Sequence, residues 1–426
     1  MTRTLALIDG EHYAPTVRDA LAELPYEFVG AVFIGGSEKL RGGEEYGVMV
    51  LADLDAALRE LEPELVLDLS DEPVLGPRAR FRLASRVLAA GVPYAGADFR
   101  LDPPRYAPLE PPLPSLAVFA DGKRVGKTAA SAHVARLLAQ DREVIVVAMG
   151  RGGPETPEVV ERAPSLADLL ELSRRGLHAA SDYLEIAAVA SVVTIGCRRC
   201  GGGLAGAVAT SSVPGGTELA LERNPDLLVF DGSGAAIPPV AVGKRLLVTS
   251  TFNDPELVCG YLNAYRLLLS DLVLITMADE GTPHEELARA LREVQPEAPV
   301  IATMLRPRPL APVEGKQVAY FTTAREGSHE RLAAFLREEH GADVVFVSGN
   351  LSDRTVLAEE LERLDAEVYL TELKGAAIDL VAEVGDARGV EVVLAANDLV
   401  PLAGQPELEP ELRALAEAAE AEPVGT

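Results

Sequence analysis

The chain has 426 residues and a formal net charge of −27, with 48% hydrophobic and 25% charged residues. At about 100–200 residues per domain, this length predicts two to four globular domains with ample buried cores. A surface this acidic repels nucleic acid and anionic membranes, so we expect neither as a partner. No apolar run approaches the ~18 residues of a membrane span and no signal peptide is evident, so we expect a cytoplasmic protein.

Two proline-rich stretches divide the chain into three predicted α/β domains. Asp102–Pro114 and Arg306–Pro312 are dense in proline, which disfavours both helices and central strands. We therefore expect an N-terminal α/β domain over residues 1–112, a nucleotide-binding domain over 113–308 and a C-terminal α/β domain over 309–426.

The first domain alternates strand-like and helix-like runs, which predicts a Rossmann-like parallel sheet with helices on its faces. Ligands of such sheets lie beyond the carboxyl ends of the strands. Glu11 and His12 directly follow the first strand, where His12 can hold a phosphate, move a proton or serve only as a hydrogen-bonded structural side chain. The predicted strands are Leu5–Ile8, Glu27–Ile34, Val48–Leu51 and Leu65–Leu69, and the helices are Thr16–Leu24, Leu54–Leu61 and Pro77–Ala90.

The second domain opens with a phosphate-binding loop. Residues 121–128 read Asp-Gly-Lys-Arg-Val-Gly-Lys-Thr, between a predicted strand, Leu116–Ala120, and a predicted helix, Lys127–Leu138. The pattern G-x-x-x-x-G-K-[ST] fails only at its first position, which Asp121 occupies. Backbone N–H groups of such a loop cradle phosphates, Lys127 would neutralise the β- and γ-phosphates, and Thr128 would bind Mg²⁺. The predicted ATP-binding residues are Gly122, Lys123, Arg124, Val125, Gly126, Lys127 and Thr128.

Two acidic residues follow further strands of this domain. Asp231 ends the apolar run Leu227–Phe230, so we predict that it acts with Thr128 on the metal or orients a nucleophile; a turn-capping Asp is the alternative. Asp279 follows Leu272–Thr276 and is a weaker candidate for reading the adenine. The remaining predicted strands are Glu143–Met149, Leu246–Thr249 and Val300–Met304, with helices near Ser165–Arg175, Glu218–Glu222, Pro255–Leu268 and His284–Val294.

Several cations stand where anions could be bound, with plain solvent exposure as the alternative for each. Arg151 lies among glycines after a strand, and Arg198 and Arg199 lie in Gly196–Gly203, which we predict to be a flexible loop. Cys197 and Cys200 are there either as incidental thiols, as a redox pair or as half of a shared metal site.

The third domain continues the strand–helix rhythm to a Glu- and Ala-rich tail, Pro406–Thr426, which predicts a surface helix that frays at its end. Lys374 stands near the start of a helix, where it can reach an anion or remain exposed. The periodic segments are Val318–Phe321, Ser328–Glu338, Val344–Val347, Asp353–Leu364, Val368–Leu370, Ala376–Val384 and Glu391–Ala395.

Three motifs, Leu7–Tyr13, Ala120–Thr128 and Asp231–Pro239, together resemble the cyclic 2,3-diphosphoglycerate synthetase family, and Thr371–Lys374 resembles its C-terminal region. The resemblance implies closure of 2,3-bisphosphoglycerate into an intramolecular phosphoanhydride that uses ATP and releases ADP and phosphate. We also expect Mg²⁺ as a cofactor and a homodimer. Lys127, Asp231, Arg151 and Lys123 would then be catalytic. The implied substrate-binding residues are Glu11, His12, Arg151, Arg198, Arg199, Ser233 and Lys374.

Two other functions remain open from the residues alone. The phosphate loop also resembles dethiobiotin synthetase, a ligase in which a carbamate attacks ATP. A nucleotide switch or metallochaperone could use Cys197 and Cys200 for a metal, although the chain has only three Cys and six His. A bisphosphate substrate would instead require Arg and Lys from several domains.

Overall fold

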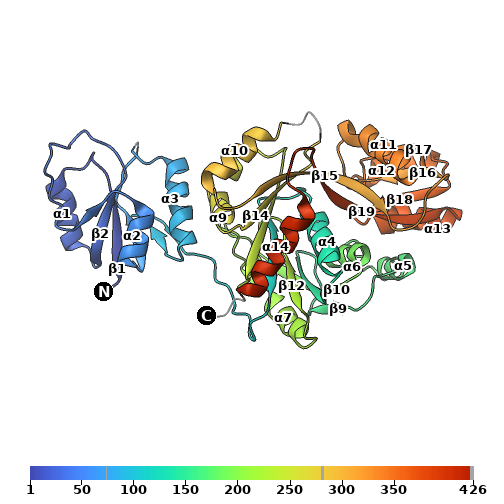
Figure 1. Cartoon of the computed structure of the whole chain (residues 1–426), viewed down its shortest axis with the longest axis horizontal. Coiled ribbons are helices and arrows are strands. Elements are labelled where there is room, and N and C mark those ends of the chain that lie inside the picture. Colours follow the sequence, from blue (N-terminus) through green and yellow to red (C-terminus); the bar gives the residue numbers. More distant parts are fainter. Residues whose placement is uncertain (73, 280–282, 423–426) are drawn as a thin grey trace.

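Two β-sheets organise the molecule, which we describe from a computed structural model. The structure describes residues 1–72, 74–279 and 283–422. In Figure 1 the N-terminal part lies at the left, and the central and C-terminal parts form one larger body beside it. No helix in these ranges is long and apolar enough to cross a membrane.

The N-terminal sheet is parallel except at its last strand, which pairs antiparallel. The strand order reverses beside β1, as in Rossmann-like folds, and the predicted α/β class is confirmed. From edge to edge the strands are β3 (Val50–Leu51), β2 (Glu27–Phe33), β1 (Arg3–Ile8), β4 (Leu65–Asp68), β5 (Tyr94–Ala95) and β6 (Arg100–Leu101). The helices are α1 (Ala14–Glu23), α2 (Leu54–Leu61) and α3 (Pro77–Ala89).

The central sheet is mainly parallel, with β9 and β11 antiparallel to β10. Its inner strands are buried on both faces, because helices cover both sides of it. Its strands lie in the order β11 (Thr210–Ser211), β10 (Val193–Cys200), β8 (Val144–Gly150), β12 (Leu227–Asp231), β7 (Ser115–Ala120), β13 (Lys244–Ser250), β14 (Leu272–Thr276) and β15 (Val300–Pro309), with β9 (Glu158–Val160) beside β10. The helices are α4 (Lys127–Leu138), α5 (Leu166–Arg174), α6 (Asp182–Ala190), α7 (Val213–Leu221), α8 (Pro255–Val258), α9 (Asn263–Leu268) and α10 (Glu285–Val294).

Two predictions for the central part were wrong, and one helix was missed. Arg198 and Arg199 do not lie in a flexible loop, because β10 pairs with β8 as far as Arg198 and with β11 beyond it. The segment of α6 was not predicted to be a helix. The helix predicted over Pro255–Leu268 is broken into α8 and α9 by Tyr261, whose φ is 47° and therefore not helical.

The second proline-rich stretch does not interrupt the structure where we expected it to. Strand β15 runs through Pro307 to Pro309 and pairs antiparallel with β19 (Glu391–Pro401). Leu310 donates its N–H to the carbonyl of Leu394 at 2.9 Å. Because backbone N–H groups alternate along a strand, the nitrogens of Pro307 and Pro309 point away from β19, so these prolines remove no hydrogen bond between the two strands. The central and C-terminal sheets are therefore one continuous sheet of 13 strands. The exact domain boundaries stay predictions.

Beyond β19 the sheet continues through parallel strands, and the C-terminal helix returns to the central part. In Figure 1 this helix, α14 (Leu408–Ala421), lies across the central sheet in red, and Leu412, Ala416 and Ala419 are buried there. The predicted fraying falls on residues 423–426, outside the described residues. The other elements are β18 (Val368–Glu372), β16 (Gln317–Phe321), β17 (Asp343–Ser348), α11 (His329–His340), α12 (Arg354–Arg363), α13 (Glu383–Arg388), a 3-10 turn (Glu326–Ser328) and a π-helix (Ala377–Ala382).

The N-terminal part is attached to the central part through α3. The Ser85 hydroxyl donates a hydrogen bond to the Tyr261 carbonyl at 2.9 Å, and the ring centroids of Phe81 and Tyr261 are 6.0 Å apart. An ion pair of 2.9 Å joins Arg78 to Glu256. The left-handed Tyr261, which ends the turn between α8 and α9, thus also forms the contact with the first domain.

Asp398 in β19 ties the helix after the phosphate loop to the C-terminal part. It lies 3.0 Å from Arg136 of α4 and 2.9 Å from Arg308 of β15, with His133 of α4 at 3.8 Å. Burial alone would raise the pKa of Asp398, but the contact with His133 and the two guanidinium charges lower it to about 2.

We predict that Asp398→Asn lowers the free energy of unfolding by about 2 kcal/mol near neutral pH, because charged hydrogen bonds of this kind are lost. Urea unfolding measures the change. Because the pKa is lowered from 3.8 to about 2, the contribution of Asp398 is present above 3.8 and is lost as the pH falls through this range. Asp343→Asn, at the exposed start of β17, is the control and should change stability by less than about 0.5 kcal/mol; equal effects would contradict the role of Asp398.

Candidate active site

The phosphate loop joins β7 to α4, and its backbone requires glycine at one position. Gly126 has a φ of 79°, and a Cβ there would lie only 3.2 Å from Cδ1 of Leu305. Arg124 also has a positive φ, of 60°. The first-turn N–H groups of α4 have no carbonyl partner within the helix, so they and the helix dipole face whatever lies in the loop. This is the geometry of an anion-binding loop.

Asp121, at the position where the motif normally has glycine, anchors the loop. Its carboxylate accepts hydrogen bonds from Thr249 Oγ1 at 2.7 Å and from Asn253 Nδ2 at 3.0 Å. Burial raises the pKa of Asp121, and these two hydrogen bonds oppose the shift. On the next strand, Thr276 donates its hydroxyl to the Val125 carbonyl at 2.7 Å. The loop is thereby fixed to the ends of β13 and β14.

Lys127 and Asp231 form a buried ion pair in the middle of this sheet edge. The Nζ of Lys127 lies 2.5 and 2.6 Å from the two carboxylate oxygens of Asp231, and Ser131 donates a further hydrogen bond to the same carboxylate. The side chains of the pair are 8% and 0% exposed. They meet because β7 and β12 are parallel neighbours whose carboxyl ends lie side by side. Burial raises the pKa of Asp231, and Lys127 opposes the shift.

Arg199 points toward the chain that follows Asp231. Its Nη2 donates to the Ser233 carbonyl at 2.8 Å and its Nη1 to the Gly201 carbonyl at 2.7 Å. The buried Nε has no hydrogen-bond partner among the described residues. Donors of this guanidinium therefore remain for a ligand beside Ser233, which is itself 2% exposed.

Two further predicted cations gather near Arg199. A Cβ placed on Gly234 would lie 3.8 Å from Lys123 Cγ and 3.8 Å from Arg199 Nη2, so Gly234 keeps open the space between these side chains. Burial lowers the pKa of Arg199, and the positive charge of Arg151, in the exposed turn after β8, lowers it further. The structure thus brings Lys123, Arg151 and Arg199 together beside the phosphate loop.

Arg198 and the cysteines are placed differently from Arg199. Consecutive side chains of a strand point to opposite faces, so Arg198 is directed away from the face of Arg199. Cys197 is buried and Cys200 exposed. Three strand residues span about 10 Å, too far for a disulfide between them. Among the described residues no group of three or more His, Cys, Asp or Glu could hold a metal ion.

Lys374 reaches the central part from the C-terminal part. It lies 3.5 Å from Glu185 of α6 and 3.8 Å from Glu372 of β18. Burial lowers the pKa of Lys374, but Glu185, Glu372 and Asp182 together raise it. Helix α6, which carries Glu185, packs against α4, the helix that begins at Lys127. Glu372 is held in place by hydrogen bonds from Tyr320, Thr322, Thr323 and Asn397.

The other predicted residues have contacts that differ from their expected roles. Asp279 lies 2.8 Å from Arg306 and 3.3 Å from Arg331, so its carboxylate already neutralises two cations. His12 lies 2.8 Å from Asp9 and 3.5 Å from Asp71, and Glu11 accepts hydrogen bonds from backbone N–H groups of residues 37 and 38. These contacts of Glu11 and His12, in the part of the chain that the structure describes, all remain within the N-terminal part.

The residues of the loop fit a nucleotide and its magnesium ion. A Cβ on Gly122 would meet nothing within 4 Å, which leaves the loop open to a ligand. Thr128 stands half-buried in the first turn of α4, beside the pair of Lys127 and Asp231. Because Mg²⁺ takes most of its ligands from phosphates and water, one hydroxyl and one carboxylate are sufficient protein ligands.

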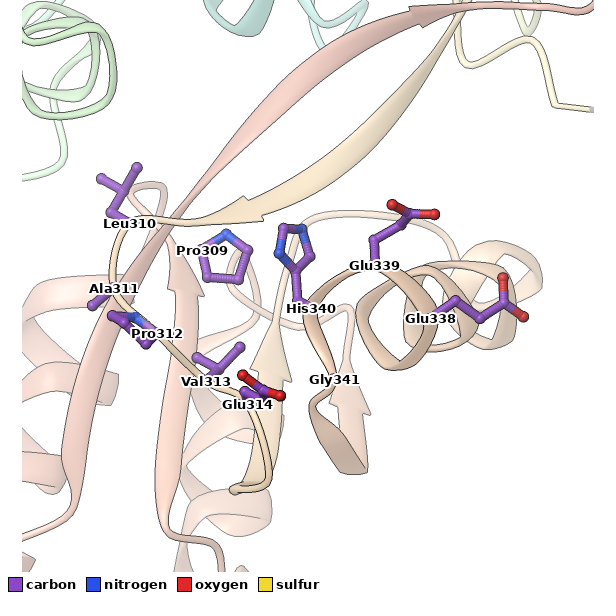
Figure 2. Close-up of a pocket in the computed structure, with 10 residues that line it drawn as sticks. All are labelled: Pro309, Leu310, Ala311, Pro312, Val313, Glu314, Glu338, Glu339, His340 and Gly341. Atoms are coloured by element: carbon purple, nitrogen blue, oxygen red, sulfur yellow. The ribbon is translucent and has the colours of Figure 1, made fainter.

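A separate depression of about 640 Å³ lies in the C-terminal part, between the chain after β15 and the end of α11 (Figure 2). It is lined by three carboxylates and one imidazole, and no Lys or Arg is among its lining residues. It therefore does not suit a phosphorylated ligand. Its lining residues are Pro309, Leu310, Ala311, Pro312, Val313, Glu314, Glu338, Glu339, His340 and Gly341.

Comparison with known families decides where the chain belongs. Models of the N-terminal, P-loop and C-terminal domains of cyclic 2,3-diphosphoglycerate synthetase match residues 3–102, 115–304 and 309–398. A protein of Rubrobacter xylanophilus with that name is 51% identical over 419 residues, covering 93% of this chain and 94% of the relative. The chain belongs to the cyclic 2,3-diphosphoglycerate synthetase family.

A second relative of the same name, from Methanothermus fervidus, is 39% identical over 427 residues, covering 93% of this chain and 92% of that protein. Among solved structures, LpxK of Aquifex aeolicus in complex with ATP has a TM-score of 0.41 at 16% identity, over 74% of this chain and 90% of that chain. The membership confirms the resemblance drawn from the sequence motifs and shows that the chain is an enzyme of this family.

Sequence reasoning missed several residues of this cyclic 2,3-diphosphoglycerate synthetase family member. Ser131 could have been found, since it lies four residues after Lys127 and so on the same helix face. Asp182 and Glu185 were missed because α6 was not predicted. Thr249 and Asn253 carry no motif of their own, and only the fold shows that they hold Asp121.

Glu185 should give this family member a pH-dependent stability. Burial raises the pKa of its carboxyl from 4.5 to about 7; Lys374 opposes the shift and Asp182 adds to it. A carboxyl with a raised pKa stabilises the fold below its ordinary value and loses that contribution as the pH rises through its folded value.

We expect the wild type to lose about 2–3 kcal/mol of unfolding free energy, relative to Glu185→Gln, as the pH rises from 4.5 to about 7. Gln cannot ionise, so the variant removes this contribution to the pH dependence. Urea unfolding of both proteins across the range measures the difference. A difference that stays constant with pH would show that Glu185 does not titrate there.

Proposed function

We propose that the chain uses ATP to close 2,3-bisphosphoglycerate into cyclic 2,3-diphosphoglycerate, releasing ADP and phosphate. One observation carries the proposal: Arg199 donates to the carbonyl of Ser233, two residues after Asp231, and Lys123 lies near it beside Gly234. The charge of Arg151, in the turn after β8, also acts on Arg199. Guanidinium and ammonium groups of this kind suit a substrate with two phosphates and a carboxylate. Family membership of the whole chain supports the same substrate.

The reaction would proceed in two displacements. An oxygen of one substrate phosphate attacks the γ-phosphorus of ATP, and the bond from that phosphorus to ADP breaks. An oxygen of the second substrate phosphate then attacks the phosphorus of the first substrate phosphate. This step forms the ring anhydride, and the group transferred from ATP leaves as inorganic phosphate. Both steps bring anions together, so positioning and neutralisation of charge carry most of the catalysis.

The positions of the site residues suggest a separate role for each of them. Lys127, now on Asp231, would exchange that contact for the β- and γ-phosphates of ATP. Lys123 would neutralise the transferred phosphoryl group, and Arg199 with Arg151 would hold the substrate phosphates. Thr128 and Asp231 would hold Mg²⁺, which supplies charge neutralisation at the phosphates when it is bound.

The C-terminal part would complete the substrate site. Lys374 contacts α6, the helix that packs against α4, and its position is fixed by Glu185 and Glu372. Binding a substrate phosphate there would let Lys374 exchange one carboxylate partner for a phosphate. Ser233, Glu11 and His12 stay predictions as substrate residues, and for the last two the structure offers no contact near the loop among the described residues. The proposal leaves out Arg198, because the alternation of β10 directs its side chain to the face opposite Arg199.

The two alternative functions, a metallochaperone and a dethiobiotin-synthetase-like ligase, receive less support. A metallochaperone needs clustered metal ligands, and Cys197 and Cys200 lie on opposite faces of β10. A dethiobiotin-synthetase-like ligase would not need three cations beside Ser233. The homodimer and the cytoplasmic location expected from the sequence remain predictions.

The direct test is to give the purified chain Mg²⁺, ATP and 2,3-bisphosphoglycerate. We predict that the bisphosphate stimulates ADP release and that ³¹P NMR shows a cyclic anhydride product and inorganic phosphate. The variant Lys127→Met, with its folding checked by circular dichroism, should lose at least about 1,000-fold in turnover, since charge stabilisation of the transferred group is lost. ATP turnover that ignores the bisphosphate would refute the proposal.

Neighbouring arginines of β10 test the substrate site. We expect Arg199→Gln to raise the KM for 2,3-bisphosphoglycerate about tenfold or more, with little change in the KM for ATP, because a bidentate phosphate contact is removed. Arg198→Gln is the matched control, since its side chain points to the other face of the strand. Equal effects of the two substitutions in steady-state kinetics would argue against the assigned site.

A further inference from the structure

An exposed aromatic ring stands next to the anchor of the phosphate loop. Phe252 follows β13 and is 46% exposed. Its neighbour Asn253 donates the hydrogen bond that holds Asp121, and Thr251, on its other side, donates to the Met277 carbonyl at 3.0 Å. Phe252 is therefore part of a fixed turn between the ends of β13 and β14. It lies outside the sequence motifs from which the site residues were predicted.

The ring is covered by a cation from another part of the chain. The guanidinium carbon of Arg325, which follows β16 in the C-terminal part, lies 3.9 Å from the centroid of the Phe252 ring. Arg331 of α11 contacts Asp279 beside it. The start of α11 thus lies against the ends of β13 and β14, and it brings a planar cation onto an aromatic face.

The sheet order shows which end of a nucleotide would lie here. Asp231, Arg151 and Arg199 come from β12, β8 and β10, on one side of β7, whereas Phe252 comes from β13 on the other side. If the γ-phosphate points toward Asp231, then the ribose and base of the same nucleotide must extend toward β13 and β14. Asp279 was expected to read the base, but its carboxylate is already paired with Arg306 and Arg331.

We propose that Phe252 is the stacking surface for the adenine of ATP and that Arg325 closes over the base. A purine offers Phe252 the same flat face that the guanidinium offers now, and Arg325 can then stack on the outer face of the base. Nucleotide binding would in this way join the central and C-terminal parts at the base as well as at Lys374. The inference rests on the proposed use of ATP and adds the residues that hold its base.

The sequence makes a direct optical test available, because the chain has no tryptophan. In Phe252→Trp the new indole is the sole tryptophan, and saturating ATP or ADP should quench its emission by stacking on it. Leu257→Trp, at a 51% exposed position five residues along the chain, is the control and should not respond. Unchanged emission of Phe252→Trp at nucleotide concentrations that support turnover would overturn the inference.

Kinetics give the second readout. Phe252→Leu keeps an apolar side chain but removes the aromatic face, so the KM for ATP should rise about tenfold while the KM for 2,3-bisphosphoglycerate stays unchanged. Phe252→Tyr should restore the wild-type value. If Phe252→Leu leaves the KM for ATP unchanged while the bisphosphate-stimulated reaction persists, the base lies elsewhere and only this inference fails. If the wild type binds no nucleotide, both this inference and the proposed function fail.

Discussion

The buried contact between Lys127 and Asp231 is the interaction around which the site is built. With side chains only 8% and 0% exposed, neither charge would be tolerated there without the other. The contact exists because β7 and β12 are neighbours in a parallel sheet, so the phosphate loop and the carboxylate emerge at one edge. The same strand order puts Arg151 and Arg199, the proposed substrate-binding arginines, on one side of the loop and the proposed base site on the other.

The C-terminal part is joined to this site more closely than three separate domains would suggest. One sheet continues through β15 and β19, and Asp398 ties it to the helix of the phosphate loop. Lys374 contacts Glu185 of α6, and Arg325 covers Phe252 in the turn after β13. The N-terminal part contacts the turn before α9 instead, and the ion-pair contacts of His12 lie within the N-terminal part.

Much of the fold could be predicted from the sequence, because buried parallel strands appear in it as short apolar runs bounded by turn residues. Leu272–Thr276 and Lys127–Leu138 were predicted with the bounds that the structure shows. The failures have physical causes. Gly196–Gly203 resembled a loop because of its glycines, although its residues as far as Cys200 are paired with neighbouring strands. Prolines were tolerated in β15 because their nitrogens point away from β19. Of the site, the loop and Asp231 could be predicted from local pattern, whereas the hold of Asn253 on Asp121 depends on distant strands meeting.

We propose that nucleotide phosphates replace Asp231 on Lys127 while the substrate lies beside Ser233. A crystal structure with Mg²⁺, a non-hydrolysable ATP analogue and 2,3-bisphosphoglycerate is the decisive experiment. We expect Lys127 Nζ within hydrogen-bond distance of phosphate oxygens of the analogue, and substrate phosphates on Arg199 and Lys123. A complex in which Lys127 stays on Asp231, or in which the bisphosphate lies away from Arg199, would refute this arrangement.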